Sequence, residues 1–164
     1  MLFVTKPIEF PEEVRRHEKY DDKDELIMKN LMSDARLSAR QLSLAVGLST
    51  VTVLSRIKRL EKIGVIRGYH ASIDHEKAGY GLVAIIEVAA KNTELSHVEE
   101  SISKYENVCA IYDVTGATDL LIVAKFRSRS ELSAFIKDLE NIKHLKSTVT
   151  HVVLNTIKED FRLM

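Results

Sequence analysis

Cysteine, proline and tryptophan are scarce in this sequence: its 164 residues include one cysteine, two prolines and no tryptophan. One cysteine cannot form a disulfide framework or a cysteine-based zinc site within a single chain, and it fits a reducing compartment. Cys109 stands in an apolar run, so we expect a small buried side chain there. With 45% hydrophobic and 29% charged residues, the composition excludes a disordered or fibrous chain and favours a globular one.

Long apolar segments are also missing. The apolar residues 1–4 are followed closely by Lys6 and Pro7, and they are too few for the core of a signal peptide. The longest apolar stretch, residues 82–90, contains Glu87 and has about half the length that a membrane span needs. We therefore expect a soluble protein of the cytoplasm.

The patterns of catalytic and metal sites are absent from the sequence. Its six histidines are scattered without the spacing of metal ligands, and even His70 and His75 stand too irregularly to suggest a site. No Ser-His-Asp order, phosphate loop or pair of catalytic carboxylates is found. These absences predict a protein that is not an enzyme, with no catalytic residue, metal ligand or cofactor.

The net charge of the chain is zero, but the charges are unevenly distributed. Residues 36–70 hold seven cations and only one acid, Glu61, whereas the rest of the chain is acidic. A solvated helix face would mix both signs, so this segment predicts a cationic surface that attracts DNA phosphates. The cations are Arg36, Arg40, Arg56, Lys58, Arg59, Lys62 and Arg67.

The first part of the chain has helical periodicity. Residues 1–21 hold both prolines and are interpreted as an N-terminal extension, with a short strand or arm and then a little helix. A helix of about a dozen residues is expected from Asp22. Ser38 is expected to cap a short helix over 39–46, in which Leu42, Ala45 and Val46 point inward and which Gly47 ends.

A third helix follows after a three-residue turn and runs from Ser49 to Ile63. Two β-prone runs on either side of Arg67-Gly68 predict a small hairpin, or wing, within residues 65–73. Helix, helix, turn, helix and wing make a winged helix-turn-helix, which we assign to residues 22–73, with a linker over 74–81.

Residues 82–164 change to a mixed pattern. The expected elements are strand 82–90, helix 93–105, strand 108–115, strand 120–126, a helix capped by Ser130, and strand 148–158. This βαββαβ order predicts a ferredoxin-like domain, with two helices on one face of an antiparallel sheet, and makes the whole chain α+β. The other face would then need cover, which a homodimer packing sheet against sheet would supply.

The third helix carries the candidate DNA-binding residues. Val53, Ile57 and Leu60 form an inward stripe, and an outward face runs from small polar residues to basic ones. Such a face suits base reading in the first turns and phosphate binding further along, although an ordinary amphipathic helix with a basic surface has the same pattern. The backbone N–H of Ser38 is a further candidate for a phosphate. The full set is Ser38, Ser49, Thr50, Val51, Thr52, Ser55, Arg56, Lys58, Arg59, Lys62 and Arg67.

Several linked motifs resemble one family. They are Asp24-Glu25-Leu26-Ile27, Asp34-Ala35-Arg36-Leu37-Ser38, Gly47-Leu48-Ser49 and the run from Arg56 to Tyr69. The sequence over residues 22–158 is similar to the Lrp/AsnC (leucine-responsive, feast/famine) regulators of prokaryotic transcription. It departs from them at Ser43, where alanine is usual, and at Thr50 and Thr52, where prolines are frequent. The last two differences bear on which DNA sequence is read.

The resemblance implies an amino-acid effector bound by the second domain, between dimers of a larger ring. It points to the turn 115–119, where a glycine and a carboxylate could meet the two ends of a zwitterion. From the residues alone, a plain hairpin turn is the preferred interpretation of Gly-x-x-Asp. The implied effector-binding residues are Thr115, Gly116 and Asp119, with Tyr112, Thr148 and Thr150 as further candidates.

We therefore expect a homodimer that assembles further, to an octamer, and binds palindromic or pseudo-palindromic sites on double-stranded DNA. A small amino acid would modulate its DNA binding or its assembly. Two alternatives remain. The first is an architectural DNA-binding protein of the same fold without an effector, and the second is an enzyme, or an enzyme's regulatory subunit, that uses the ferredoxin-like half. The basic third helix speaks against the second alternative.

Overall fold

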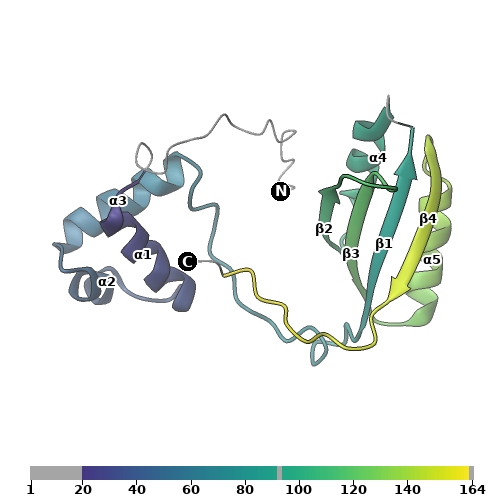
Figure 1. Ribbon diagram of the computed structural model, residues 1–164. Helices are drawn as coiled ribbons and strands as arrows, with labels where there is room; N and C mark the ends of the chain where they lie inside the picture. Colours follow the sequence, from purple (N-terminus) through teal and green to yellow (C-terminus); the bar gives the residue numbers. More distant parts are fainter. Residues whose placement is uncertain (1–19, 92–93, 163–164) are drawn as a thin grey trace. The chain divides into compact units, whose positions relative to one another are not determined.

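The computed structural model describes residues 20–91 and 94–162. It divides into two compact units, each described here by itself: one contains the described residues up to Ser72 and from Asp160 onward, and the other contains Ile73–Glu159 (Figure 1). The strand and helix expected in the N-terminal extension lie outside the described residues, except for Tyr20 and Asp21.

Three helices make up the first unit: α1 (Asp22–Ser33), α2 (Ala39–Val46) and α3 (Thr50–Lys62). Side-chain caps set their starts, since Asp21, Ser38 and Ser49 each accept a hydrogen bond from the backbone N–H three residues on. Gly47 ends α2 with a φ of 70°, a left-handed conformation that glycine adopts without strain. The three helices and both serine caps predicted from the sequence are thus confirmed.

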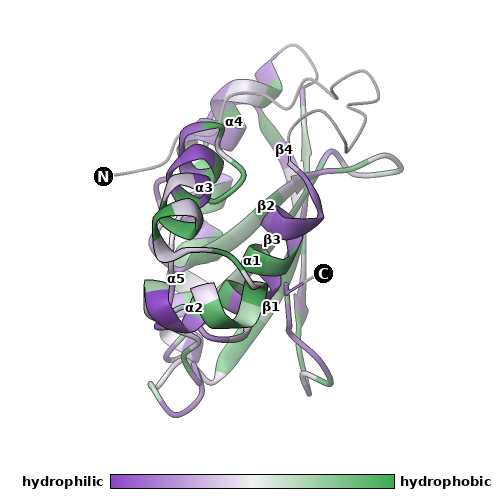
Figure 2. Ribbon diagram, turned by 90° about the vertical axis from the view of Figure 1, so that its left-hand side faces the viewer, coloured by the Kyte–Doolittle hydropathy of each residue, from purple (hydrophilic) through white to green (hydrophobic). Residues whose placement is uncertain are grey.

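The core of this unit joins all three helices. Ile27, Leu42, Val46 and Val53 are buried together, and Ile57 packs against them. The inward stripe of α3 is confirmed, and Figure 2 shows both hydrophobic and hydrophilic residues along the ribbon of this helix. The inward position expected for Ala45 is wrong, because this residue is exposed at the end of α2.

The hairpin expected within residues 65–73 does not form, and this stretch has no strand. The N–H groups of Val65 and Ile66 instead donate to the carbonyl of Leu60 and close the end of α3, where Gly64 has a φ of 74°. Residues 67–73 are exposed. A lone two-stranded hairpin without an apolar surface to pack on has little stability, so the β-prone residues there stay unpaired.

The second unit has the βαββαβ order expected from the sequence. Its elements are β1 (Leu82–Ala90), α4 (Leu95–Ile102), β2 (Val108–Asp113), β3 (Leu120–Phe126), α5 (Arg129–Glu140) and β4 (Leu145–Val152). The strands form one antiparallel sheet in the order β2-β3-β1-β4. Helices α4 and α5 cover the same face of this sheet (Figure 1).

Several boundaries differ from the expected ones. Helix α4 ends at Ile102 rather than at residue 105, strand β2 ends at Asp113 rather than at residue 115, and strand β4 begins at Leu145 rather than at residue 148. Helix α5 is capped by Ser128, whose hydroxyl accepts the Glu131 N–H at 3.2 Å, and Ser130 lies inside the helix. Strand β4 ends at Val152 rather than at residue 158. The Val153 N–H still donates to the Val83 carbonyl, but β1 begins at Leu82 and offers no backbone for residues 155–158.

Fully buried and half-buried residues alternate along β1 and mark the two faces of the sheet. Ala84, Ile86 and Val88 are fully buried beneath the helices. The residues between them point to the opposite, open face, where Glu87 stands beside Leu121 of β3 and Val149 of β4. Neither α4 nor α5 covers this open face. Its other members by register include Ile85, Ala110, Tyr112, Val123 and His151.

Candidate nucleic-acid interface and effector site

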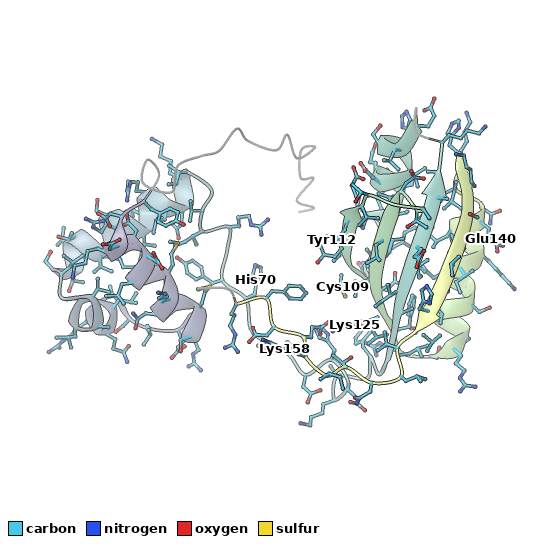
Figure 3. All side chains as sticks on the ribbon, in the orientation of Figure 1. His70, Cys109, Tyr112, Lys125, Glu140 and Lys158 are labelled. Carbon is cyan, nitrogen blue, oxygen red and sulfur yellow. The ribbon has the colours of Figure 1, made fainter. Side chains whose placement is uncertain are left out.

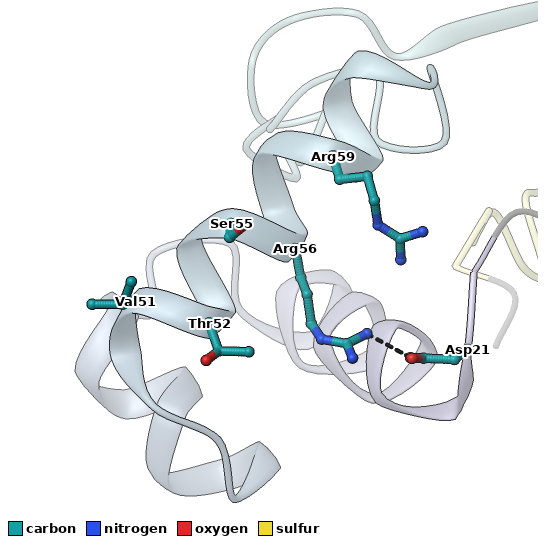
Figure 4. Close-up of a pocket in the computed structure, with 6 residues that line it drawn as sticks. All are labelled: Asp21, Val51, Thr52, Ser55, Arg56 and Arg59. Atoms are coloured by element: carbon teal, nitrogen blue, oxygen red, sulfur yellow. Dashed lines mark hydrogen bonds and ion pairs between the residues drawn. The ribbon is translucent and has the colours of Figure 1, made fainter.

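The first half of α3 presents uncharged side chains to solvent. Val51 is 78% exposed, and Thr52 and Ser55 are exposed as well. Together with Asp21, Arg56 and Arg59 they line an open concavity of about 600 Å³ (Figure 4). The hydroxyl groups of Thr52 and Ser55 can form hydrogen bonds with base edges, and the side chain of Val51 can make apolar contacts with them.

The serine and threonine candidates at the helix starts already use most of their hydrogen-bonding groups within the protein. Ser49 Oγ accepts the Thr52 N–H at 3.1 Å and lies 2.8 Å from Thr52 Oγ1. The Ser38 N–H, a candidate phosphate donor, donates to Gln41 Oε1 at 2.8 Å. Thr50 is half-buried in the first turn of α3. These residues therefore build the α2 and α3 starts, and any DNA contact by them needs their remaining hydrogen-bonding capacity.

The second half of α3 carries exposed lysines. Lys58 and Lys62 form no ion pair with any residue of the ranges 20–91 and 94–162, so their ammonium groups are available to phosphates. Arg67 is exposed beyond the end of the helix and does not line the concavity. The tyrosine that follows is held in place, because Tyr69 Oη donates to Glu61 at 2.9 Å.

Both arginines of α3 are held by aspartates of α1. Arg56 Nη1 donates to Asp21 Oδ1 at 2.7 Å and to Asp24 Oδ1 at 2.9 Å, and Arg59 Nη2 is ion-paired with Asp24 Oδ2. The hydrogen bonds from Arg56 and from the Asp24 backbone lower the pKa of Asp21 from 3.8 to about 2. The expected outward position of Arg59 thus comes with an ion pair, which the sequence reasoning missed.

The turn between β2 and β3 brings together three of the effector-site candidates. Thr115 and Gly116 are exposed. Gly116 has a φ of 134°, a backbone angle that residues other than glycine rarely adopt. Asp119 is half-buried, and its Oδ2 accepts the Ala90 N–H at 2.7 Å. Its Oδ1 makes no hydrogen bond with another described residue, so half of this carboxylate can still bind a ligand.

The other three candidates lie elsewhere on the sheet. Tyr112 is 44% exposed and stands opposite Leu121 on the open face (Figure 3). Thr148 and Thr150 pair with Val88 and Ile86, so they lie on the helix-covered face of β4. Two strands separate β4 from β2. Within one chain, the six candidates therefore do not form a single site.

Other candidate chemistry is sparse in the described part of the chain. Residues 20–91 and 94–162 contain no group of three His, Cys, Asp or Glu residues that could hold a metal ion. None of the helices described has the length and apolar character to cross a membrane. Cys109 is exposed, not buried as expected, because the pairing of β2 with β3 shifts register between Val108 and Ala110 and turns it outward.

Comparison with known proteins matches both units. Residues 20–67 match a profile described as winged helix-turn-helix DNA-binding, and residues 83–163 match the Lrp/AsnC ligand binding domain. The chain is 40% identical over 143 residues to an uncharacterized HTH-type transcriptional regulator of Pyrococcus furiosus. This match covers 87% of the chain and 97% of the relative.

Comparison with solved structures gives the same result as the sequence matches. A transcriptional regulator from Neisseria meningitidis, crystallised in complex with L-Met, is 30% identical, with a TM-score of 0.81 over 88% of this chain and 96% of that one. The leucine response regulatory protein LrpA of Mycobacterium tuberculosis is 26% identical, with a TM-score of 0.80 over 88% and 99%. The chain therefore belongs to the Lrp/AsnC family: it is a transcription regulator, not an enzyme, with a helix-turn-helix DNA-binding unit and an Lrp-type ligand-binding unit.

Proposed function

We propose that this regulator reads palindromic or pseudo-palindromic DNA sites through α3, and that an amino acid bound by the second unit modulates its DNA binding or its assembly. The observation that carries the proposal is the division of α3 into an uncharged exposed half and a half with exposed lysines. A helix inserted in the major groove needs the first to distinguish bases and the second to grip phosphates.

The proposed DNA contacts follow this division. Val51, Thr52 and Ser55 contact base edges, and Lys58 and Lys62 bind phosphates. Arg67 extends the cationic stretch beyond the helix. The caps Ser38 and Ser49 and the first-turn residue Thr50 support the starts of α2 and α3, while Arg56 and Arg59 line the concavity beside Thr52 and Ser55.

The proposed effector is a free amino acid. The ligand-binding profile and the L-Met complex of the Neisseria meningitidis relative support this class of ligand. The open oxygen of Asp119 is suited to an ammonium group, and the backbone N–H groups of Thr115 and Gly116 are suited to a carboxylate. We place Tyr112, Thr148 and Thr150 in the same pocket only through a neighbouring copy of the chain, because one chain keeps them apart.

The proposed assembly starts from the open face of the sheet. This face carries Tyr112, Val123 and Val149, and Val149 is 51% exposed in the single chain. Packing this face against its copy would bury these apolar side chains and create a two-fold dimer, which matches a palindromic site. We further propose that dimers join to a ring of up to eight chains, and that the protein works in the cytoplasm, where DNA and free amino acids are both accessible.

The DNA-binding part is tested by selecting duplexes from a random-sequence library with the purified full chain. We expect enrichment of sites with two-fold symmetry, bound more tightly than mixed-sequence DNA. Enrichment without any symmetry would contradict the palindromic site, and no enrichment at all would contradict sequence-specific reading.

The effector part is tested by thermal melting of the full chain with each of the twenty amino acids. A ligand present at 100 times its Kd stabilises the folded state by about 2.7 kcal/mol, so at least one amino acid should raise the Tm. A Tm that none of them changes would favour the alternative, an architectural DNA-binding protein of the same fold.

A further inference from the structure

Two aspartates at the start of α1 meet the middle of α3. Asp21 is the N-cap of α1, and Asp24 completes the capping box by accepting the Asp21 N–H at 2.9 Å. Asp21 also accepts two contacts from Arg56, at 2.7 and 2.8 Å. Figure 4 shows the guanidinium of Arg56 directed toward Asp21.

Asp24 is the centre of this cluster. Its side chain is fully buried, while those of Arg56 and Arg59 are 26% and 46% exposed. One carboxylate oxygen binds Arg56, and the other binds Arg59. A buried carboxylate is costly unless it is paired, so the fold requires these arginines to remain on Asp24. The pairing therefore fixes how α3 is rotated about its axis against α1.

The cations of α3 consequently fall into two sets. Arg56 and Arg59 are neutralised from behind by two aspartates, whereas Lys58 and Lys62 have no ion-pair partner among the described residues. The first set lies beside the uncharged residues that line the concavity. Its neutralisation lowers the sequence-independent attraction of DNA at the place where bases are to be read.

We propose that Asp24, assisted by Asp21, is a positioning residue that sets sequence selectivity by holding Arg56 and Arg59 off the DNA phosphates. This inference rests on the proposed reading of DNA by α3. With the carboxylate in place, tight binding requires the correct bases. Without its charge, Arg59 loses its ion pair with Asp24 and Arg56 keeps only Asp21, so both guanidinium groups are held less firmly and can turn to phosphates, which are the same in every sequence.

The principal test is the variant Asp24→Asn in the full chain, which keeps the shape of the side chain and removes its charge. Binding is titrated at several salt concentrations on a selected duplex and on a mixed-sequence duplex. The slope of log K against log salt should steepen by about 0.9 for each phosphate newly contacted. The ratio of the two affinities should fall by about tenfold, through tighter binding to mixed-sequence DNA.

The matched control is Glu25→Gln. It removes one negative charge from the neighbouring position of the same helix, but Glu25 pairs with Lys29 at 3.1 Å in solvent and contacts neither arginine. Its salt slope should equal that of the wild-type protein. An equal steepening in this control would overturn the proposal, because net charge alone would then explain the effect.

If circular dichroism shows that Asp24→Asn does not fold, a second pair of variants tests the proposal. Asp21 is 56% exposed, and asparagine is as good an N-cap as aspartate, so Asp21→Asn keeps α1 and removes one of the two carboxylates that hold Arg56, which stays paired with Asp24. Its slope should be steeper than that of the wild-type protein, and adding Arg56→Gln should remove the increase.

Folded Asp24→Asn or Asp21→Asn proteins with wild-type slopes and selectivity would overturn the inference and leave DNA reading by α3 intact. A wild-type protein that binds no DNA would overturn both.

Discussion

The side chains of α3 differ most in what holds them. Lys58 and Lys62 stand in solvent without ion pairs to described residues, while Arg56 is fixed by two carboxylates. The sequence predicts the cations themselves, because their spacing and the lack of nearby acids are visible in it. It does not predict that Asp24, an ordinary first-turn acid of a helix, is buried, because this depends on where α3 crosses α1.

The first prediction concerns Lys58. Lys58→Ala should weaken binding to all duplexes alike and lower the salt slope by about 0.9, because one phosphate contact is lost. Fluorescence anisotropy on selected and mixed-sequence duplexes measures both quantities. Lys29→Ala, which removes an exposed lysine of α1 that pairs with Glu25, is the control. Identical slopes for the two variants would remove Lys58 from the contact surface.

The second prediction concerns acid stability and Asp21. Because the pKa of Asp21 is lowered to about 2 in the folded chain, its ionised form favours the folded state. This contribution is fully present above the ordinary value near 4 and is lost as pH falls toward 2. Melting of the full chain between pH 5 and 2 should therefore show a smaller loss of Tm for Asp21→Asn than for the wild type. Parallel curves would contradict the role given to the Arg56 contact.

At the scale of elements, local chemistry explains where prediction succeeded. Ser38, Gly47 and Ser49 bound α2 and α3 because a cap acts within one turn of its helix. Prediction failed where a distant partner decides: residues 65–73 find no strand to pair with, and β4 extends only as far as β1 lies beside it. The six effector-site candidates were chosen by resemblance to the family, without knowledge of how the strands pair. The register of β4 shows that Thr148 and Thr150 face the helices, away from the open face that carries Tyr112.

The third prediction concerns the β2–β3 turn. Asp119→Asn keeps an oxygen that can accept the Ala90 N–H and removes the negative charge proposed to bind an amino acid. The amino acid that raises the wild-type Tm should no longer raise that of this variant, although its circular dichroism spectrum is unchanged. An undiminished rise in Tm would show that Asp119 is a structural residue of the turn alone.

At the scale of the whole molecule, two units with different tasks are joined through residues 72–73 and 159–160. The second unit is built around one core beneath its sheet, in which the ring of Phe135 contacts the rings of both Tyr105 and Phe126. Its other face has no such cover within the unit. A transcription regulator that reads two-fold symmetric DNA needs a two-fold axis of its own, and the open face is the surface suited to provide it.

The fourth prediction concerns assembly. Val149→Asp places a charge on the open face, at a position that is half-exposed in one chain and would be buried in a dimer. Sedimentation should show a wild-type oligomer and a variant shifted to monomer, because burying an unpaired charge is costly. Lys104→Asp, a charge change at an exposed position just beyond the end of α4, should leave the oligomer intact. A Val149→Asp protein that sediments like the wild type would place the dimer contact elsewhere.

The most direct test of DNA reading by α3 is a footprint of the full chain on a selected duplex. Two recognition helices related by a two-fold axis should protect two major-groove segments, with centres about one helical turn, or a multiple of it, apart. Ser55→Lys, a change on the exposed half of α3, should alter the sequence selected within those segments. Protection confined to phosphates, with the same selected sequence for Ser55→Lys and the wild type, would contradict DNA reading by α3.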